Sequence, residues 1–339
     1  MGLRIIPSQT NIPFSSFRNI SAIVSLAAMV GSIVALFTLG LNFGIDFRGG
    51  VTIEVGPAEE QTFVPDDLTA VRSAVSTLDL GNVIAKEIGG TAGAKDGIAV
   101  IVELQTDEAA ASSPEEGDGV DQAAERRQTE VADLVKATLS ETLGEGISFR
   151  RVDVVGPTIS GELIQKGVLA MVVAIGLMLV YIWFRFEWQF SLGAILALVH
   201  DVILTVGIFC LTQLDFTLPI IAALLTIIGY SMNDTVVVYD RIRENLRKFK
   251  KKPLEEVIDL SINQTLARTL MTSITTLLAL FSLFLFGGDV LRGFSFALIW
   301  GVLVGTYSSV FIASPLLLRT GVKRDWSKVT SGEGQVATT

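Results

Sequence analysis

The sequence predicts an α-helical integral membrane protein with six transmembrane helices and an α+β domain inserted between helices 1 and 2. Half of the 339 residues are hydrophobic and only 18% are charged, with a mean hydropathy of +0.55, whereas soluble domains are about 25% charged. The apolar residues lie in blocks of about 20, the length that a helix needs to cross a bilayer. These observations exclude a purely soluble protein and an intrinsically disordered one.

Six segments meet the length requirement for a membrane-spanning helix. The first, at about 20–41, contains no charge between Arg18 and Asp46. A secretory signal peptide has an apolar core of only about 7–15 residues, so we interpret this segment as an uncleaved span. The other five spans lie at about 167–184, 190–211, 216–239, 269–288 and 293–318.

Acidic residues gather in one part of the chain. Residues 43–162 hold 9 basic and 23 acidic residues, a net charge of −14, and the remainder holds 17 basic and 12 acidic ones, a net charge of +5. Because nucleic acid is a polyanion, this acidic segment argues against nucleic acid as a partner. The single Cys210 excludes an intrachain disulfide, and with His200 as the one histidine we expect no metal site.

Positive residues predict the orientation, because short loops on the cytoplasmic side of a membrane are enriched in Lys and Arg. The loop 240–262 holds seven of them, and both terminal tails hold others. The connections on the opposite side, 212–215 and 287–292, hold one between them. We therefore expect both termini in the cytoplasm and the acidic segment in the periplasm. The predicted parts are a tail (1–17), helix 1 (18–42), the exported domain (43–162), helices 2–6 (163–318) and a second tail (319–339).

The exported segment alternates between strand and helix patterns. Its expected strands are 46–55, 82–88, 98–104 and 147–155, and its expected helices are 65–78 and 122–143. Glycines at 89–93 indicate a turn, and 106–119 is predicted to be a loop. The order β-α-β-β-α-β is that of a ferredoxin-like fold. Because the segment contains no Gly-rich phosphate loop, calcium loop, Cys or His, we interpret it as a binding or coupling module rather than an enzyme.

Ionisable residues inside the spans are functional candidates, since each costs at least about 2.5–3.5 kcal/mol on insertion scales. Asp234 lies in the fourth span, and Arg268, at the start of the fifth, is the nearest cation at the same depth. We predict a pair that forms when Asp234 is ionised and loosens when it is protonated. Position alone fits equally well with Arg268 as an arginine that reaches the lipid headgroups.

The third span contains two adjacent polar residues, His200 and Asp201. Asp201 is either a proton relay or a carboxylate that is hydrogen-bonded between helices, and the sequence leaves both interpretations open. His200 is expected to pack beside Asp201 rather than to bind a metal.

Small residues recur at every fourth position of the sixth span. They are Ala297, Gly301, Gly305 and Ser309. This spacing lets two helix backbones approach closely, so we interpret the stripe as a packing seam. Gly229 and Ser231 similarly favour close packing, or flexing, beside Asp234.

Several motifs lie at the membrane borders. An F-x-G-G motif follows the first span, and a V-G-P motif precedes the second. The fourth span continues into a charged helix, which anchoring to lipid headgroups would explain by itself. The residues of these motifs are Phe47, Gly49, Gly50, Gly156, Pro157, Gly229, Asn233, Asp240, Arg241, Arg243, Glu244 and Asn245. In combination, and over about 15–320, they resemble the SecD/SecF family of the RND-type transporter superfamily.

The resemblance implies a proton-driven transport subunit rather than an enzyme, with the proton gradient as its energy source and no cofactor. It implies residence in the bacterial inner membrane, pairing with SecD and action beside the SecYEG channel. YajC-type accessory subunits, a translocating preprotein and the lipid bilayer are the further partners expected. Asp234 and Arg268 match the aspartate and arginine of the family's proton path, and the argument from membrane depth adds Asp201.

Two other functions stay open. In a passive scaffold that holds a complex together, substitutions of Asp234 and Arg268 would act only through the abundance of that complex. An autonomous small-molecule exporter would need a homodimer, because six spans are half of the usual RND complement. An intramembrane protease is disfavoured, because no GxGD or serine–lysine arrangement is evident.

Overall fold

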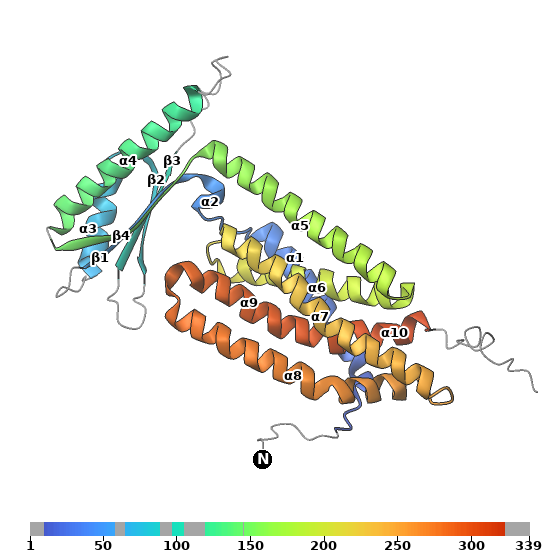
Figure 1. Ribbon diagram of the computed structural model, residues 1–339. Coiled ribbons are helices and arrows are strands. Elements are labelled where there is room, and N and C mark those ends of the chain that lie inside the picture. Colours follow the sequence, from blue (N-terminus) through green and yellow to red (C-terminus); the bar gives the residue numbers. More distant parts are fainter. Residues whose placement is uncertain (1–9, 58–64, 89–96, 105–118, 145, 323–339) are drawn as a thin grey trace, which may run out of the picture.

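The computed structural model shows a bundle of long helices joined to a smaller α+β domain (Figure 1). It describes residues 10–57, 65–88, 97–104, 119–144 and 146–322. Most of the predicted loop 106–119, the whole glycine turn 89–93 and the outer parts of both tails lie outside these residues.

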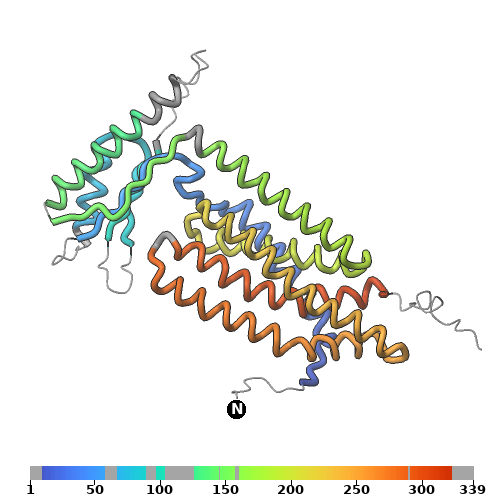
Figure 2. Tube along the Cα trace, viewed as in Figure 1, coloured from blue at the N-terminus to red at the C-terminus, as the bar shows by residue number. Residues whose placement is uncertain are grey.

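Six helices in the described residues are long and apolar enough to cross a membrane, as the sequence predicts. They are α1 (Arg18–Thr38), α5 (Pro157–Arg185), α6 (Trp188–Thr212), α7 (Leu218–Lys248), α8 (Leu254–Phe286) and a sixth made of α9 (Gly288–Ser308), the π-helical turn η2 (Ser309–Ala313) and α10 (Ser314–Thr320). A 3₁₀ turn, η1 (Phe14–Phe17), precedes α1. Although far apart in sequence, α1 and α6 lie side by side (Figure 2), and a side chain at Gly207 would clash with Ser32.

Three of the helices are longer than their apolar segments predict. The predicted loop 240–262 is a loop only at 249–253, because α7 and α8 continue on either side of it. Two acidic residues in the first turn of α8, Glu255 and Glu256, complement the positive end of the helix dipole there. At the other side of the bundle, α5 already begins at Pro157, since proline suits the first turn of a helix.

The α+β domain has the strand and helix order that the sequence predicts. Its elements are β1 (Gly50–Pro57), α3 (Pro65–Ser76), β2 (Gly81–Ile88), β3 (Gly97–Leu104), α4 (Gly119–Leu143) and β4 (Ile147–Val155). The strands form an antiparallel sheet in the order β2-β3-β1-β4. Alternate residues of the central strands, among them Val51, Ile53 and Val100, point to one face. There they form a buried core with Val71 of α3 and Val135 of α4.

The chain enters this sheet through a helical turn that the sequence pattern does not predict. Residues 46–55 were expected to form one strand, but α2 (Ile45–Arg48) precedes β1. Gly49 and Gly50 cause the break, because their φ angles of 74° and 139° are ones that other residues rarely adopt. Gly50 also lies so close to the backbone carbonyl of Val102 on β3 that a side chain there would clash with it.

The F-x-G-G motif also ties the domain to the bundle. Asp46 accepts a hydrogen bond of 2.8 Å from the backbone N–H of Leu218, the first residue of α7. A carboxylate at this position also complements the helix dipole. The next residue, Phe47, is buried and packs against Phe216, with 6.0 Å between the ring centroids. The entry to the sheet is therefore anchored at the start of α7.

An ion pair links α2 to the sheet. Arg48 pairs with Glu103 on β3, and Asn82 on β2 donates a hydrogen bond of 2.9 Å to the same carboxylate. Partial burial by itself raises the pKa of Glu103, but the hydrogen bonds from Asn82 and Arg48 and the Arg48 charge outweigh it and lower the pKa. The contact therefore stabilises the domain above the unfolded pKa of about 4.3, and this contribution is lost as the pH falls through the lower folded value.

This ion pair predicts a pH dependence of the domain. As the pH falls below about 4.3, the amides of β2 and β3 should lose protection from hydrogen exchange, measured after correction for the intrinsic exchange rate. In Glu103→Gln, the loss in free energy of unfolding at acid pH should be smaller than in the wild type. The difference should be less than about 1 kcal/mol, because the pair is partly exposed. Glu87→Gln, on β2 and outside the pair, is the control. An identical pH dependence in both variants would contradict the role of Glu103.

The stripe of small residues on α9 packs against α7. A side chain at Gly301 would clash with Ile227, and a Cβ at Gly305 would lie 3.0 Å from the Cβ of Ser231. Ala297 is fully buried in the same apolar cluster as Ile227. The fourth residue of the stripe, Ser309, belongs to η2 and faces the site described below.

Gly301→Ala is therefore expected to destabilise the bundle by about 1–3 kcal/mol, the usual cost of an overpacked core. Adding Ile227→Ala should recover part of this loss, because it removes the side chain that the new methyl group meets. Thermal unfolding of the full chain in detergent measures the effect. Gly176→Ala on α5 is the matched control, since nothing lies within 4 Å of a Cβ there. Equal losses in the two single variants would refute the close contact.

Candidate functional site

Asp234 lies inside the bundle on α7 and is 7% exposed. Its Oδ1 accepts a hydrogen bond of 2.8 Å from Thr269 Oγ1 on α8, and its Oδ2 accepts one of 3.0 Å from Ser309 Oγ in η2. Among the described residues, both partners of the carboxylate are hydroxyl groups. A hydroxyl can donate to a carboxylate or accept from a carboxylic acid, so these partners can serve Asp234 in either protonation state.

A second carboxylate, Asp201, lies on α6 and is 1% exposed. Its Oδ2 accepts hydrogen bonds from Ser231 Oγ on α7, at 2.5 Å, and from Ser308 Oγ at the end of α9, at 2.7 Å. Its Oδ1 lies 2.9 Å from Nδ1 of the adjacent His200. Of the two interpretations that the sequence left open, a carboxylate hydrogen-bonded between helices describes this geometry.

The same two elements serve both carboxylates. On α7, Ser231 donates to Asp201, and Asp234 lies one helical turn further on, on the same side of the helix. At the end of α9, Ser308 donates to Asp201 and the next residue, Ser309, donates to Asp234. The regular helix gives way to the π-helical turn between these two serines, and such turns are frequent at functional sites.

The predicted ion pair between Asp234 and Arg268 is not formed in this structure. In the described part of the chain no hydrogen bond or ion pair joins them, and Arg268 is exposed on α8. The next residue, Thr269, is buried and points to Asp234 instead. Arg268 is the residue that precedes Thr269, which donates to the carboxylate of Asp234.

The charged end of α7 connects helices, which headgroup anchoring alone does not explain. Asp240 accepts hydrogen bonds of 2.8 and 2.7 Å from Nη2 of Arg185 at the end of α5. Asn245 is buried, and its Nδ2 donates to Ser261 Oγ and Gln264 Oε1 of α8, each at 2.9 Å. Asp240 and Asn245 therefore fasten α7 to its neighbours on two sides.

Two further contacts complete this motif. Arg241 pairs with Glu244 one turn along α7, with 2.9 Å between Nη1 and Oε2. The guanidinium of Arg243 lies over the ring of Phe186, 5.5 Å from its centroid, next to the end of α5. From the sequence, Arg241, Arg243 and Glu244 were known only as members of a family motif. The structure shows a contact for each of them.

The V-G-P motif begins α5. Gly156 precedes the helix in extended backbone, and Pro157 occupies the first turn, where its missing N–H leaves no helical hydrogen bond unmade. A Cβ at Gly156 would lie 3.3 Å from Nε2 of Gln128, a buried residue of α4. The motif therefore marks the close contact between the α+β domain and the start of α5.

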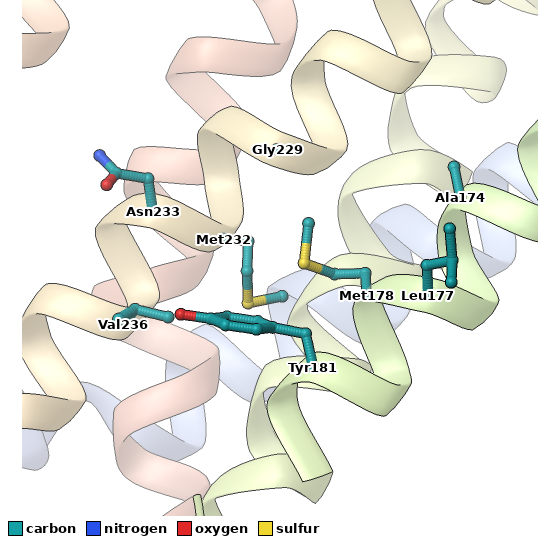
Figure 3. Close-up of a pocket in the computed structure, with 8 residues that line it drawn as sticks. All are labelled: Ala174, Leu177, Met178, Tyr181, Gly229, Met232, Asn233 and Val236. Carbon is teal, nitrogen blue, oxygen red and sulfur yellow. The ribbon is translucent and has the colours of Figure 1, made fainter. Parts of the chain in front are cut away.

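A cavity of about 480 Å³ lies between α5 and α7, on the side of α7 that carries Gly229 and Asn233 (Figure 3). Met178 and Met232 point toward each other across it. It is lined by Ala174, Leu177, Met178, Tyr181, Gly229, Met232, Asn233 and Val236. Gly229 has no atom within 4 Å of its Cβ position, so it faces open space rather than a packed helix.

Sequence reasoning missed the hydroxyl partners of the two carboxylates. Thr269 and Ser308 were not singled out, and Ser309 was interpreted only as a packing residue. Hydroxyl residues inside apolar spans are the signal that could have identified them, because such groups hydrogen-bond across helices. Among the described residues, no group of three or more His, Cys, Asp or Glu side chains is placed to hold a metal ion.

Comparisons with known proteins agree with the motifs. The family described as "Protein export membrane protein SecD/SecF, C-terminal" matches residues 135–323, and the "SecD/SecF GG Motif" matches 34–57. The protein translocase subunit SecF of Cereibacter sphaeroides is 44% identical, over 98% of this chain and 96% of its own. The subunit of the same name from Rickettsia bellii is 42% identical, over 93% and 95%.

Solved structures are similar as well. The crystal structure of SecDF, a translocon-associated membrane protein from Thermus thermophilus, matches with a TM-score of 0.73 at 33% identity. The match covers 94% of this chain and 39% of that one, so the chain spans about two fifths of the SecDF protein. The family model matches more than half of the chain, and the SecF relatives match it almost from end to end. The chain therefore belongs to the SecD/SecF family and groups with its SecF members.

Proposed function

We propose that this chain is a subunit of the Sec protein-export machinery that, with SecD, uses the proton motive force to move preproteins through the SecYEG channel across the bacterial inner membrane. The observation that carries the proposal is Asp234, a buried carboxylate on a helix long enough to span the membrane, held by two hydroxyls. The names of its relatives support the setting in protein export.

Asp234 is the residue that binds and releases the proton in this proposal. Its hydroxyl partners suit both protonation states, so a proton can arrive and leave without breaking the helix contacts. Arg268, which makes no ion pair with any other described residue, acts as a nearby charge that stabilises the ionised form and approaches it further in another state of the cycle. One elementary charge moved through 100 mV supplies about 2.3 kcal/mol, which is enough to bias a conformational equilibrium.

The proposed topology places both termini in the cytoplasm and residues 43–162 in the periplasm as a ferredoxin-like domain. The sheet order β2-β3-β1-β4 and the alternation of strands and helices support this fold. The anchorage of Asp46 and Phe47 at the start of α7 supports a coupling role, because α7 also carries Asp234. A movement of α7 would in this way reach the domain that contacts the preprotein.

Two helices offer the bundle a surface for partners. Within this chain, only 6% of the apolar stretch of α5 and 17% of that of α8 is buried. The chain corresponds to about two fifths of SecDF, which supports SecD as the protein that covers part of this surface. SecYEG, YajC-type subunits and lipid are the other proposed contacts, and the proton gradient takes the place of a cofactor.

Vesicles with and without the chain test the function. Preprotein transport into inverted inner-membrane vesicles is measured with and without an uncoupler, after depletion of the native subunit and restoration from a plasmid. We expect the restored chain to raise transport only while the proton gradient is present. Equal stimulation with the uncoupler would support a passive scaffold. Co-purification in mild detergent that returns only copies of this chain would support the homodimeric exporter.

A further inference from the structure

His200 carries a buried nitrogen that the proposed proton site does not use. The side chain is 1% exposed, and its Nδ1 lies 2.9 Å from Oδ1 of Asp201. Its Nε2 has no hydrogen-bond partner among the described residues. Buried polar atoms of this kind are rare in folded proteins, so each one requires an explanation.

The hydrogen bonds of Asp201 indicate which nitrogen of His200 is free. An ionised carboxylate can only accept hydrogen bonds, and here it faces the hydroxyls of Ser231 and Ser308 as well as the imidazole. A neutral imidazole carries one proton, which then lies on Nδ1 and is donated to Asp201. Nε2 consequently keeps an unshared lone pair inside the bundle.

We propose that His200 and Asp201 form a second proton-binding site, in which Nε2 of His200 takes the proton and Asp201 holds the ring. When a proton binds, an N–H bond forms at Nε2 and the net charge of the pair changes from −1 to 0. The imidazolium then lies beside its carboxylate, where the low dielectric of the bundle strengthens their attraction. The inference rests on the proposed function, in which Asp234 is the first proton site.

Two serines that are adjacent in the chain serve the two sites. Ser308 donates to Asp201, and Ser309, the next residue, donates to Asp234. A change of charge at Asp234 is therefore expected to act on His200 through the electric field and through the two adjacent serines at the junction of α9 and η2. Removal of the negative charge at Asp234 should make the protonated form of His200 less stable.

Few other titratable groups surround this pair in the described part of the chain. From α9, the ring of Tyr307 lies 6.1 Å from that of His200, and its hydroxyl is 3.0 Å from Ser25 Oγ of α1. On α7, the acidic residue one turn beyond Ser231, which donates to Asp201, is Asp234, and α8 contributes Arg268, which precedes Thr269. The coupling to Asp234 is therefore the main one to test.

The chain offers a direct measurement, because His200 is its single histidine. The full chain is labelled with ¹⁵N-histidine, purified through a tag without histidine, and placed in lipid nanodiscs. The ¹⁵N shifts distinguish the two neutral tautomers from the doubly protonated ring. We expect the tautomer protonated on Nδ1 at high pH and conversion to the doubly protonated ring as the pH is lowered.

Variants test the coupling. Asp234→Asn should lower the midpoint of this titration by about half a pH unit or more, which is about threefold in proton affinity. Asp201→Asn should lower it further and mix the tautomers, whereas Asp201→Glu should restore the Nδ1 tautomer. Ser282→Ala is the control, because its hydroxyl bonds only to the carbonyl of Leu278 among the described residues, on the exposed side of α8.

Two results would overturn the inference. One is a His200 ring in the wild-type chain that shows the other tautomer or does not titrate between pH 4 and pH 9. The other is a midpoint that Asp234→Asn leaves unchanged. Either result leaves the proposed function intact if Asp234→Asn still abolishes proton-dependent export. Conversely, the titration of His200 could depend on Asp234 while Asp234→Asn still exports preprotein at the wild-type level. That result would contradict the proposed function and support the second proton-binding site.

Discussion

Replacing Asp234 with Asn is expected to remove the proton-dependent part of preprotein export, a loss of about tenfold or more, as for a positioned proton-transfer group. An asparagine has the size of an aspartate. Its amide oxygen can accept from one of the hydroxyls of Thr269 and Ser309, and its NH₂ group can donate to the other. The variant should therefore fold and assemble normally but be unable to carry a proton. Transport into inverted vesicles, with and without an uncoupler, measures the loss.

Asp133→Asn is the matched control for this substitution. Asp133 lies on the exposed face of α4 and pairs with Lys136 less than one turn along the same helix. It undergoes the same chemical change outside the spans, so we expect its proton-dependent transport to stay near the wild-type level. The amount of each variant in the membrane and of co-purified partner is measured in parallel. If Asp234→Asn reduced transport only in proportion to complex abundance, the scaffold would be the better account.

Asp234 was predictable from the sequence because membrane depth and charge are both visible there. Its partner was not, because depth does not indicate the direction in which a side chain points around a helix. Consecutive residues of an α-helix point about 100° apart, so Arg268 and Thr269 share a depth but face different sides of α8. The structure points Thr269 to Asp234 and leaves Arg268 exposed. The hydroxyl network around Asp201 escaped prediction for the same reason.

The fold was predictable to the extent that periodicity reports it. Six apolar segments and an alternation of strand and helix patterns correspond to the elements observed. The lengths of α5, α7 and α8 were not predictable, because apolar residues mark only the part of a helix that lies in the membrane. The charged turns beyond the membrane carry no such signal. The π-helical turn η2 gives no signal in composition, although it lies where Ser308 and Ser309 serve two different carboxylates.

The second large effect concerns Gly50, where backbone conformation and packing both exclude a side chain. A φ of 139° strains any residue with a Cβ by about 1–3 kcal/mol. In addition, the methyl group of an alanine would clash with the carbonyl of Val102, which belongs to the backbone of a neighbouring strand. The strand cannot move away without losing the pairing between Val51 and Val102 and its neighbours along β1 and β3. Overpacking of this kind costs a further amount of about 1–3 kcal/mol.

We therefore expect Gly50→Ala to destabilise the α+β domain by about 2–6 kcal/mol, while the helix bundle persists. Hydrogen exchange of the full chain in detergent separates the two, because amides of β1 and β3 should lose protection and those of α7 and α9 should keep it. Gly161→Ala, near the start of α5, is the control, since its Cβ meets nothing within 4 Å and an alanine favours the helix. If Gly50→Ala kept full protection in β1, the left-handed entry to the sheet would be dispensable.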